Sequence, residues 1–522
     1  MAKLFTAQAA RICSATGQPS PAPIPPAQRR THGLQGAALV MAAALSVGLT
    51  ACGGGDDGGT TPPTGNNAPA PTPTPTPTPA PTPAPTPAPA PSPAPAPTPT
   101  PVPATYSVGG TVSGLAAGKS VTLLNNGGDA VTVGANGSFQ FPTRLAQGKP
   151  YAATVGTRPS GENCTVANGT GTVGTANVTN IAVTCTLRPL FGYAVNSLDG
   201  TVSAYTLDAT TGLPTQIGST AVSVGNEPLS LTIDPAGKFV YVANANDNTV
   251  TTLSINQTTG ALTVVGSPTP TGSQPYSITR TPSGKFVYTA NFGDNTLSAF
   301  SVNTTTGALS SPATVIPAGV NPYTITTNST GTFAYVVNAD TANTTGTAMA
   351  FAINSTTGML TQVGSTVTAG SVPQFITLTP NGKFAYVANS GDNTLGVYSI
   401  DGTGALTASG SPVTAGTNPY TMAVSPAGNF LYVVNILSNN VSVFSINAAN
   451  GALTLVDTTA TGANPVTIVI NPAGTFAYVV TANDNTVTAY SINATTGKLT
   501  AVPSGTAATG LLPRGMALVA VP

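Results

Sequence analysis

Histidine and charged side chains are scarce in this sequence. The chain of 522 residues has one histidine, His32, and no tryptophan, and its 15 basic residues balance 15 acidic ones. So sparse and balanced a charge creates no field that would steer a nucleic acid or an acidic membrane surface. No basic run or aromatic RNA-binding motif interrupts the C-terminal part, so nucleic-acid binding is not expected.

Residues 1–51 have the pattern of an export signal. Arg29 and Arg30 precede an apolar run of small residues over 34–49, and the sequence Leu-Thr-Ala-Cys then ends at Cys52. This order is typical of a signal peptide, and the apolar run is too short to span a membrane. A short buried helix and a twin-arginine signal are the alternative interpretations. The last four residues resemble a lipobox, so Cys52 is expected to carry a lipid that anchors the mature protein to a membrane.

Residues 52–104 follow the cleavage site and are rich in proline, threonine and alanine. Alternating proline cannot form helices or sheet ladders and favours extended polyproline II, so we expect a disordered, extended linker. Gly53 favours sorting to the outer membrane, by resemblance to lipoproteins of Gram-negative bacteria, with the protein facing the periplasm or the cell surface. Cleavage also removes His32, so the mature chain has no imidazole to serve as a base or a metal ligand.

Residues 105–187 hold short apolar or alternating segments separated by glycine turns, among them 120–124 and 151–155. Segments of this length and pattern predict strands, and together they predict a small β-sandwich domain. Cys164 and Cys185 lie in it, and we expect them to form a disulfide because the compartment is oxidising. A pair of metal ligands is the alternative, which the loss of His32 disfavours; no metal and no cofactor are expected.

Residues 188–522 consist of a repeat. One motif, Phe-x-Tyr followed by two small or apolar residues and usually Asn, occurs seven times, with its tyrosine at Tyr193, Tyr241, Tyr288, Tyr335, Tyr386, Tyr432 and Tyr478. The tyrosines are separated by 46 residues (Tyr386 to Tyr432) to 51 residues (Tyr335 to Tyr386). This period is typical of the four-stranded blades of a β-propeller. The copies share an inner strand that begins at Gly-x-x-Pro, the Phe-x-Tyr strand, a third strand and an outer strand. Four copies have an Asp-Asn turn before the third strand, and four have an Asn-x-Thr-Thr-Gly turn before the outer strand.

The two ends of the repeat are out of phase. The first Phe-x-Tyr strand has no Gly-x-x-Pro strand before it, whereas the last such strand, 513–521, has nothing after it. The C-terminal strand is therefore expected to complete the first blade and close the ring at seven blades. The sequence predicts an all-β protein, with a seven-bladed β-propeller preceded by a small β-sandwich and a Pro-rich linker.

The repeated Tyr-Val-x-Asn resembles the seven-bladed propellers of the lactonase family, related to bacterial 6-phosphogluconolactonase, and the YVTN repeats of surface-layer proteins. The resemblance covers 188–522 and implies the fold. It also implies a carboxylic ester hydrolase acting on a sugar lactone. A propeller hosts enzymes, ligand binders and scaffolds alike, so the activity depends on the site.

The candidate site is the mouth of the channel that the inner strands are expected to line. Side chains on both sides of the shared proline define this mouth. The residue before the proline is Glu227, Gln274, Asn321, Val372, Asn418, Asn464 or Leu512, and the residue after it is Leu229, Tyr276, Tyr323, Gln374, Tyr420, Val466 or Arg514.

Glu227 and Arg514 are the single acid and the single base of this ring, and they are expected on neighbouring blades. They are the candidate catalytic pair, because lactone hydrolysis needs a base and a group that stabilises an oxyanion. Gln274, Tyr276, Tyr323 and Tyr420 are candidate ligand-binding residues. The ring either caps a water-filled channel or forms a ligand pocket.

Arg280 is a further candidate for ligand binding, because the other copies of the repeat place an uncharged, mostly apolar residue there. Its guanidinium is expected either to reach the surface or to meet an anionic partner such as a ligand. The Asp-Asn turns could suggest calcium, but each offers a single carboxylate and turn chemistry explains them.

Two functions follow from the sequence. The first is an envelope-anchored lipoprotein that presents its propeller as a binding or scaffold surface for a small molecule, a glycan or a protein. The alternative is a lactonase-type hydrolase of a sugar lactone or a related ester. No catalytic constellation in the sequence decides whether the protein is an enzyme.

Overall fold

The computed structural model describes residues 103–159, 161–310, 315–340 and 345–521, and every regular element in them is a β-strand. Within these ranges no helix has the length and apolar character needed to cross a membrane. The signal peptide, Cys52 and all but the last two residues of the linker lie outside the described residues. The all-β prediction is confirmed for the residues that the structure describes.

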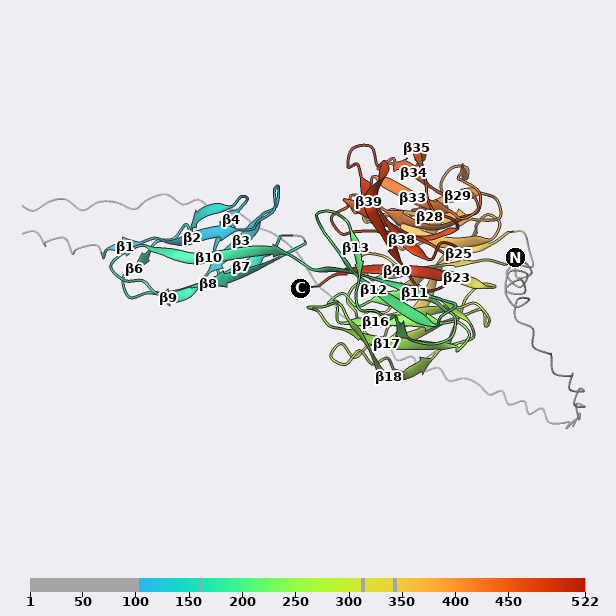
Figure 1. The fold of residues 1–522 in the computed structure, drawn as a ribbon, viewed down its shortest axis with the longest axis horizontal. Coiled ribbons are helices and arrows are strands. Elements are labelled where there is room, and N and C mark those ends of the chain that lie inside the picture. Colours follow the sequence, from blue (N-terminus) through green and yellow to red (C-terminus); the bar gives the residue numbers. More distant parts are fainter. Residues whose placement is uncertain (1–102, 160, 311–314, 341–344, 522) are drawn as a thin grey trace, which may run out of the picture. The chain divides into compact units, whose positions relative to one another are not determined.

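The first domain is a sandwich of two four-stranded sheets (Figure 1). One sheet has the order β5 (Gly137–Gln140), β2 (Val108–Ser113), β10 (Val178–Leu187) and β8 (Glu162–Ala167). The other has the order β4 (Asp129–Val133), β3 (Val121–Asn125), β7 (Pro150–Thr157) and β9 (Thr170–Thr172), and β1 (Thr105–Tyr106) pairs with β6 (Leu145–Ala146). Alternate residues of the two sheets point inward and bury Val108, Leu123 and Phe141.

The predicted disulfide joins Cys164 of β8 to Cys185 of β10. The two residues stand opposite each other on antiparallel strands. Both are buried in the core of the sandwich.

The second domain consists of seven sheets, which we number as blades in ring order. Blade one contains β40 (Pro513–Ala520), β11 (Leu190–Asn196), β12 (Thr201–Leu207), β13 (Pro214–Gln216) and β14 (Val222–Ser223). Blade two contains β15 (Pro228–Ile233), β16 (Phe239–Asn244), β17 (Thr249–Ile255) and β18 (Leu262–Pro270). Blade three contains β19 (Pro275–Arg280), β20 (Phe286–Asn291), β21 (Thr296–Ser301) and β22 (Val315–Pro317).

The other four blades follow the same order from the inner to the outer strand. Blade four contains β23 (Pro322–Thr327), β24 (Phe333–Asn338), β25 (Thr347–Ile353) and β26 (Leu360–Thr368). Blade five contains β27 (Pro373–Leu378), β28 (Phe384–Asn389), β29 (Thr394–Ile400), β30 (Leu406–Ala408) and β31 (Val413–Thr414). Blade six contains β32 (Pro419–Val424), β33 (Phe430–Asn435), β34 (Asn440–Ile446) and β35 (Leu453–Ala460). Blade seven contains β36 (Pro465–Ile470), β37 (Phe476–Thr481), β38 (Thr486–Ile492) and β39 (Leu499–Ala508).

The C-terminal strand closes the ring. Figure 1 shows β40, in red, beside β11 and β12, in green, and β40 pairs with β11 from Leu190 opposite Ala520 to Ala194 opposite Met516. The prediction that the last strand supplies the inner strand of blade one, and that the ring has seven blades, is confirmed.

The Phe-x-Tyr motif joins each blade to the next. In blade three, the Tyr288 hydroxyl donates to the carbonyl of Gly358 in blade four over 2.8 Å. A Cβ at Gly358 would lie 2.3 Å from the Phe286 ring, and the residue has a φ of +73°. Only glycine meets both conditions, which explains the invariant glycine of the Asn-x-Thr-Thr-Gly turn within this chain. Phe476 of blade seven contacts Gly212 of blade one in the same way, across the closure.

The Asp-Asn turns tie the loops of the channel mouth together. The Asp294 carboxylate accepts the N–H of Ser273 in its own blade, and the Asn295 side chain accepts the N–H of Asn321 in the next blade over 2.7 Å. Asn295 has a φ of +62°, a conformation that asparagine tolerates. The carboxylate therefore serves the turn as a backbone acceptor.

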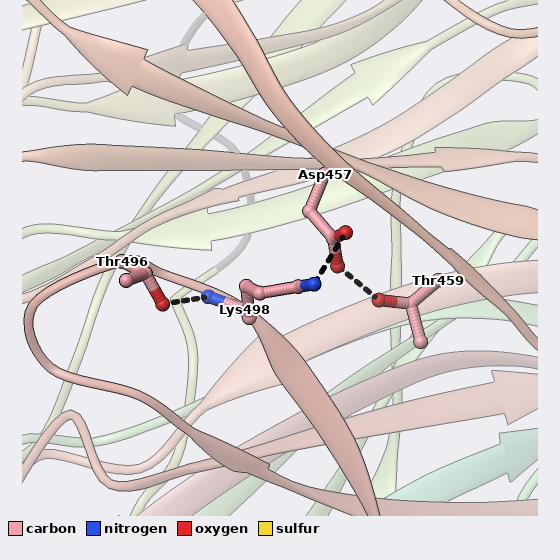
Figure 2. A network of polar contacts seen from close by, with 4 residues as sticks. All are labelled: Asp457, Thr459, Thr496 and Lys498. Carbon is pink, nitrogen blue, oxygen red and sulfur yellow. Dashed lines mark hydrogen bonds and ion pairs between the residues drawn. The ribbon is translucent and has the colours of Figure 1, made fainter.

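An ion pair joins the outer strands of blades six and seven. Figure 2 shows Lys498, at the turn before β39, reaching Asp457 of β35, with 3.4 Å between Nζ and Oδ1. Asp457 also accepts a hydrogen bond from Thr459 over 3.1 Å. Because the Lys498 side chain is 59% exposed, this pair contributes at most about 1 kcal/mol.

Candidate functional site

The channel mouth is built from a strained turn that recurs in every blade. The residue before the shared proline has a positive φ in all seven copies: Glu227 52°, Gln274 52°, Asn321 52°, Val372 49°, Asn418 59°, Asn464 58° and Leu512 52°. Non-glycine residues rarely adopt this conformation, least of all a β-branched one or one that precedes proline. Asparagine side chains from the preceding blades hold several of these turns, as Asn248 does for the N–H of Gln274. Sequence reasoning located this ring but missed its conformation.

Four aromatic side chains pack together at this mouth. Tyr276 of β19 stacks on Phe292, with ring centroids 4.3 Å apart, and meets Tyr323 of β23 edge to face at 5.4 Å. Tyr323 meets Tyr420 of β32 edge to face at 6.3 Å, and their hydroxyls lie 3.2 Å apart. We call these four residues the aromatic cluster. Its residues come from blades three, four and six.

Glu227 and Arg514, the predicted pair, both affect the pKa of a tyrosine in this cluster. Burial raises the pKa of Tyr276, the charges of Glu227 and Tyr420 raise it further, and Arg514 lowers it. Burial also raises the pKa of Tyr323 well above its ordinary value, and Arg514 again opposes this rise. A carboxylate and a guanidinium from neighbouring blades are therefore both within electrostatic range of the Tyr276 phenol. The structure brings Tyr276, Tyr323 and Tyr420 together and places Tyr276 within electrostatic range of Glu227 and Arg514, while the roles of these residues remain predictions.

The backbone around Arg514 is held on two sides. Its carbonyl accepts a hydrogen bond from the Thr467 hydroxyl of blade seven over 2.5 Å. On the other side, a Cβ at Gly515 would lie 3.1 Å from the Leu229 carbonyl of blade two, so β40 and β15 approach closely there. These contacts fix the position of the Arg514 backbone in the ring.

Arg280 lies at the opposite end of β19 from Tyr276. Its guanidinium donates hydrogen bonds to the carbonyls of Ile233 and Thr281. Burial lowers its pKa, and the negative charge of Asp234 opposes that shift. The structure thus gives Arg280 protein partners and does not bring it to the aromatic cluster. Gln274, by contrast, lies beside the cluster, because its carbonyl accepts the N–H of Phe292 over 2.8 Å.

Phe292 is a member of the cluster that sequence reasoning missed. It follows the motif residue Asn291, at a position where the other blades have Ser197, Ala245, Ala339, Ser390, Ile436 or Ala482. The one aromatic residue among these mostly small side chains was the available signal.

A surface cleft of about 310 Å³ lies away from the cluster, between blades two and three. Asp234, Lys238, Tyr241 and Thr305 are among its lining residues. The Asp234 carboxylate is already occupied by the N–H groups of Ala236, Lys238 and Phe239.

Potential metal ligands gather at one place in the described residues. Glu162, Cys164 and Cys185 lie together in the sandwich, and the two sulfurs are joined in the disulfide.

The chain matches a family model described as "Lactonase, 7-bladed beta-propeller" over residues 163–276, 269–374, 373–470 and 423–511. Similar solved structures include a putative 6-phosphogluconolactonase from Bacteroides uniformis, with 22% identity and a TM-score of 0.57, covering 64% of this chain and 100% of that chain. The periplasmic gluconolactonase of Pseudomonas aeruginosa has 17% identity and a TM-score of 0.53, covering 65% of this chain and 100% of that chain. No curated protein matches the chain. At these identities the structural likeness shows the fold.

Proposed function

The chain belongs to the lactonase family of seven-bladed β-propellers, and on this premise we propose that the propeller binds a small ligand bearing a carbonyl or carboxylate group at the mouth that carries Glu227 and Arg514. The observation that carries this proposal is that both charges act on Tyr276 within one aromatic cluster. Aromatic surface with a few convergent polar groups is the usual composition of a small-molecule site. Arg514 would bind the oxygen atoms of the ligand, and Tyr276 would contact its apolar face.

The same proposal includes the location of the protein. The export pattern of 1–51 and the candidate anchor Cys52 support a lipoprotein that displays the propeller from the outer membrane. The structural likeness to a periplasmic gluconolactonase agrees with export. A ligand would then be a molecule of the periplasm or the surroundings of the cell.

A panel of sugar lactones, the corresponding aldonates and neutral sugars tests the binding proposal by calorimetry on the purified protein. We expect members with a carbonyl or carboxylate group to bind and neutral sugars of equal size to bind less tightly. If neutral sugars bind as well as aldonates, Arg514 does not select the ligand. If no member of the panel binds, the proposed site is wrong for this ligand class.

Hydrolysis of a lactone is the second candidate function, favoured by the family and by a carboxylate and a guanidinium in one neighbourhood. Glu227 would accept a proton from a water molecule, whose oxygen attacks the lactone carbonyl. Arg514 would stabilise the oxyanion. The ring C–O bond would then break, with the proton on Glu227 passing to the leaving oxygen. No step uses histidine, in agreement with a sequence whose single histidine is His32.

Turnover of the same lactones tests this second function. Glu227→Gln should lower kcat at least about 100-fold, because a positioned general base contributes that much, while Kd changes little. Equal turnover by the wild type and by Glu227→Gln would exclude Glu227 as the base.

A further inference from the structure

Glu162 is an acidic residue buried in the core of the sandwich, with 1% of its surface exposed. Its Oε1 accepts the N–H of Ala116 over 2.9 Å. Its Oε2 is equally buried, and within the described residues it has no hydrogen-bond partner. Such an oxygen is costly to bury, so its presence requires an explanation beyond packing.

Both cysteines of the sandwich stand next to this carboxylate. Glu162 and Cys164 are two residues apart on β8, so they share its inward face, and Cys185 lies opposite Cys164 on β10. A carboxylate oxygen of Glu162 and the two Sγ atoms all lie within 4.8 Å of one another. Three potential ligands of one metal ion therefore converge at a single point of the core.

We infer that Glu162, Cys164 and Cys185 form a redox-gated site for a zinc-like divalent cation. Thiolate and carboxylate are both common zinc ligands, and a water molecule would complete a tetrahedral set of four. The disulfide blocks the site in the oxidised protein, because a sulfur bonded to another sulfur is not a thiolate ligand. The reduced protein gains two thiolates and turns the buried Oε2 from an unsatisfied acceptor into a ligand.

The reduction is a two-electron exchange with a dithiol reductant. The reductant becomes a disulfide, the bond between the two Sγ atoms breaks, and Cys164 and Cys185 each gain one electron and one proton. The cation then displaces both protons. Three anionic ligands around a divalent cation leave one negative charge. Arg188 stands beside the site, because its Nε donates to the backbone carbonyl of Glu162 over 3.1 Å.

Cobalt binding to the reduced full chain tests the inference, because bonds between Co²⁺ and thiolate give a characteristic near-ultraviolet absorption. We expect the reduced protein to bind one Co²⁺ with this band, Zn²⁺ to displace it, and the oxidised protein to lack it. The double variant Cys164→Ser/Cys185→Ser is the blank, because it keeps the other two of the chain's four cysteines and so shows any binding that they contribute. A reduced wild type with no more absorption than this blank would overturn the inference.

Glu162→Gln separates a three-ligand site from a simple dithiol. Glutamine keeps an acceptor for the Ala116 N–H, and equal melting temperatures of the oxidised wild type and variant would show that the fold is kept. We expect Zn²⁺ affinity to fall at least about tenfold in Glu162→Gln, the loss typical of a weakened ligand set. Asp129→Asn changes a partly exposed carboxylate of the same domain, which contacts Thr143 instead of the cysteines, and should leave the affinity unchanged. If the reduced Glu162→Gln protein binds Zn²⁺ as tightly as the wild type, Glu162 is not a ligand and the proposed site is wrong.

Discussion

The hydroxyls of Tyr323 and Tyr420 lie 3.2 Å apart, although their inner strands belong to blades four and six. The two side chains meet across blade five, where Gln374 instead donates to the hydroxyl of Ser390 over 2.8 Å. The contact between the two tyrosines joins non-adjacent blades at the channel mouth. The proposed site therefore includes a packed aromatic surface.

Tyr420→Phe should destabilise the propeller by about 1 kcal/mol, because it leaves the half-buried Tyr323 hydroxyl without this partner. Urea unfolding measures the change. The double variant Tyr323→Phe/Tyr420→Phe should cost less than the sum of the two single variants, since it removes both partners together. Strictly additive costs would show that the two hydroxyls do not interact.

Removing the C-terminal strand should open the ring. Deletion of residues 513–522 exposes the edge of β11 and removes the buried side chains of Met516 and Val519. Burial of these two side chains alone is worth about 3 to 6 kcal/mol, so a large fall in melting temperature is expected. Leu511→Ala is the control, because Leu511 is exposed and should change stability little. A truncated protein that melts with the wild type would contradict the closure.

Alkaline pH should destabilise the propeller through its buried tyrosines. Burial raises the pKa of Tyr205, Tyr335 and Tyr398 to about 12 from an ordinary value of 10.0. The unfolded chain loses these protons near pH 10 while the folded protein keeps them, so the stabilisation is complete below pH 10 and disappears as pH rises towards 12. Melting temperature measured from pH 8 to 11.5 should stay level at first and then fall. A level profile across the whole range would contradict the burial of these phenols.

The fold could be predicted almost completely from the sequence. Seven copies of Phe-x-Tyr are strong evidence because each phenylalanine packs against the turn glycine of the next blade, as Phe286 does against Gly358, so the motif must recur. Four of the seven tyrosines also donate to the carbonyl of that glycine. The missing first strand and the extra last strand then determined the closure. The disulfide followed from the cysteine count and the expected compartment.

The site was less predictable. The positions of Glu227 and Arg514 in the ring followed from the repeat, but the aromatic cluster depends on side-chain directions that no repeat specifies. Tyr420 meets Tyr323 although blade five lies between their two blades, and Phe292 lies in a turn after β20. The hydrogen bond from Arg280 to the carbonyl of Ile233 was missed because Ile233 lies in a different copy of the repeat.

The proposed lipid anchor can be tested separately from the propeller. Cys52→Ser should abolish lipidation and move the protein from the membrane fraction to the soluble fraction, because the thiol is the site of acylation in the lipobox interpretation. Fractionation after a high-salt wash, followed by immunoblotting, measures this. A Cys52→Ser protein that still sediments with membranes would contradict the anchor.

The most direct test of the ligand site compares binding to Arg514→Ala with binding to the wild type. For the aldonate or lactone that binds the wild type most tightly, calorimetry should show Kd raised at least about fivefold in Arg514→Ala, which corresponds to about 1 kcal/mol for a lost charge-assisted hydrogen bond. Lys383→Ala removes an exposed cation in a turn of blade five and should leave Kd unchanged. Both variants should melt close to the wild type. Equal Kd values for the wild type and Arg514→Ala would contradict the proposal that this channel mouth is the functional site.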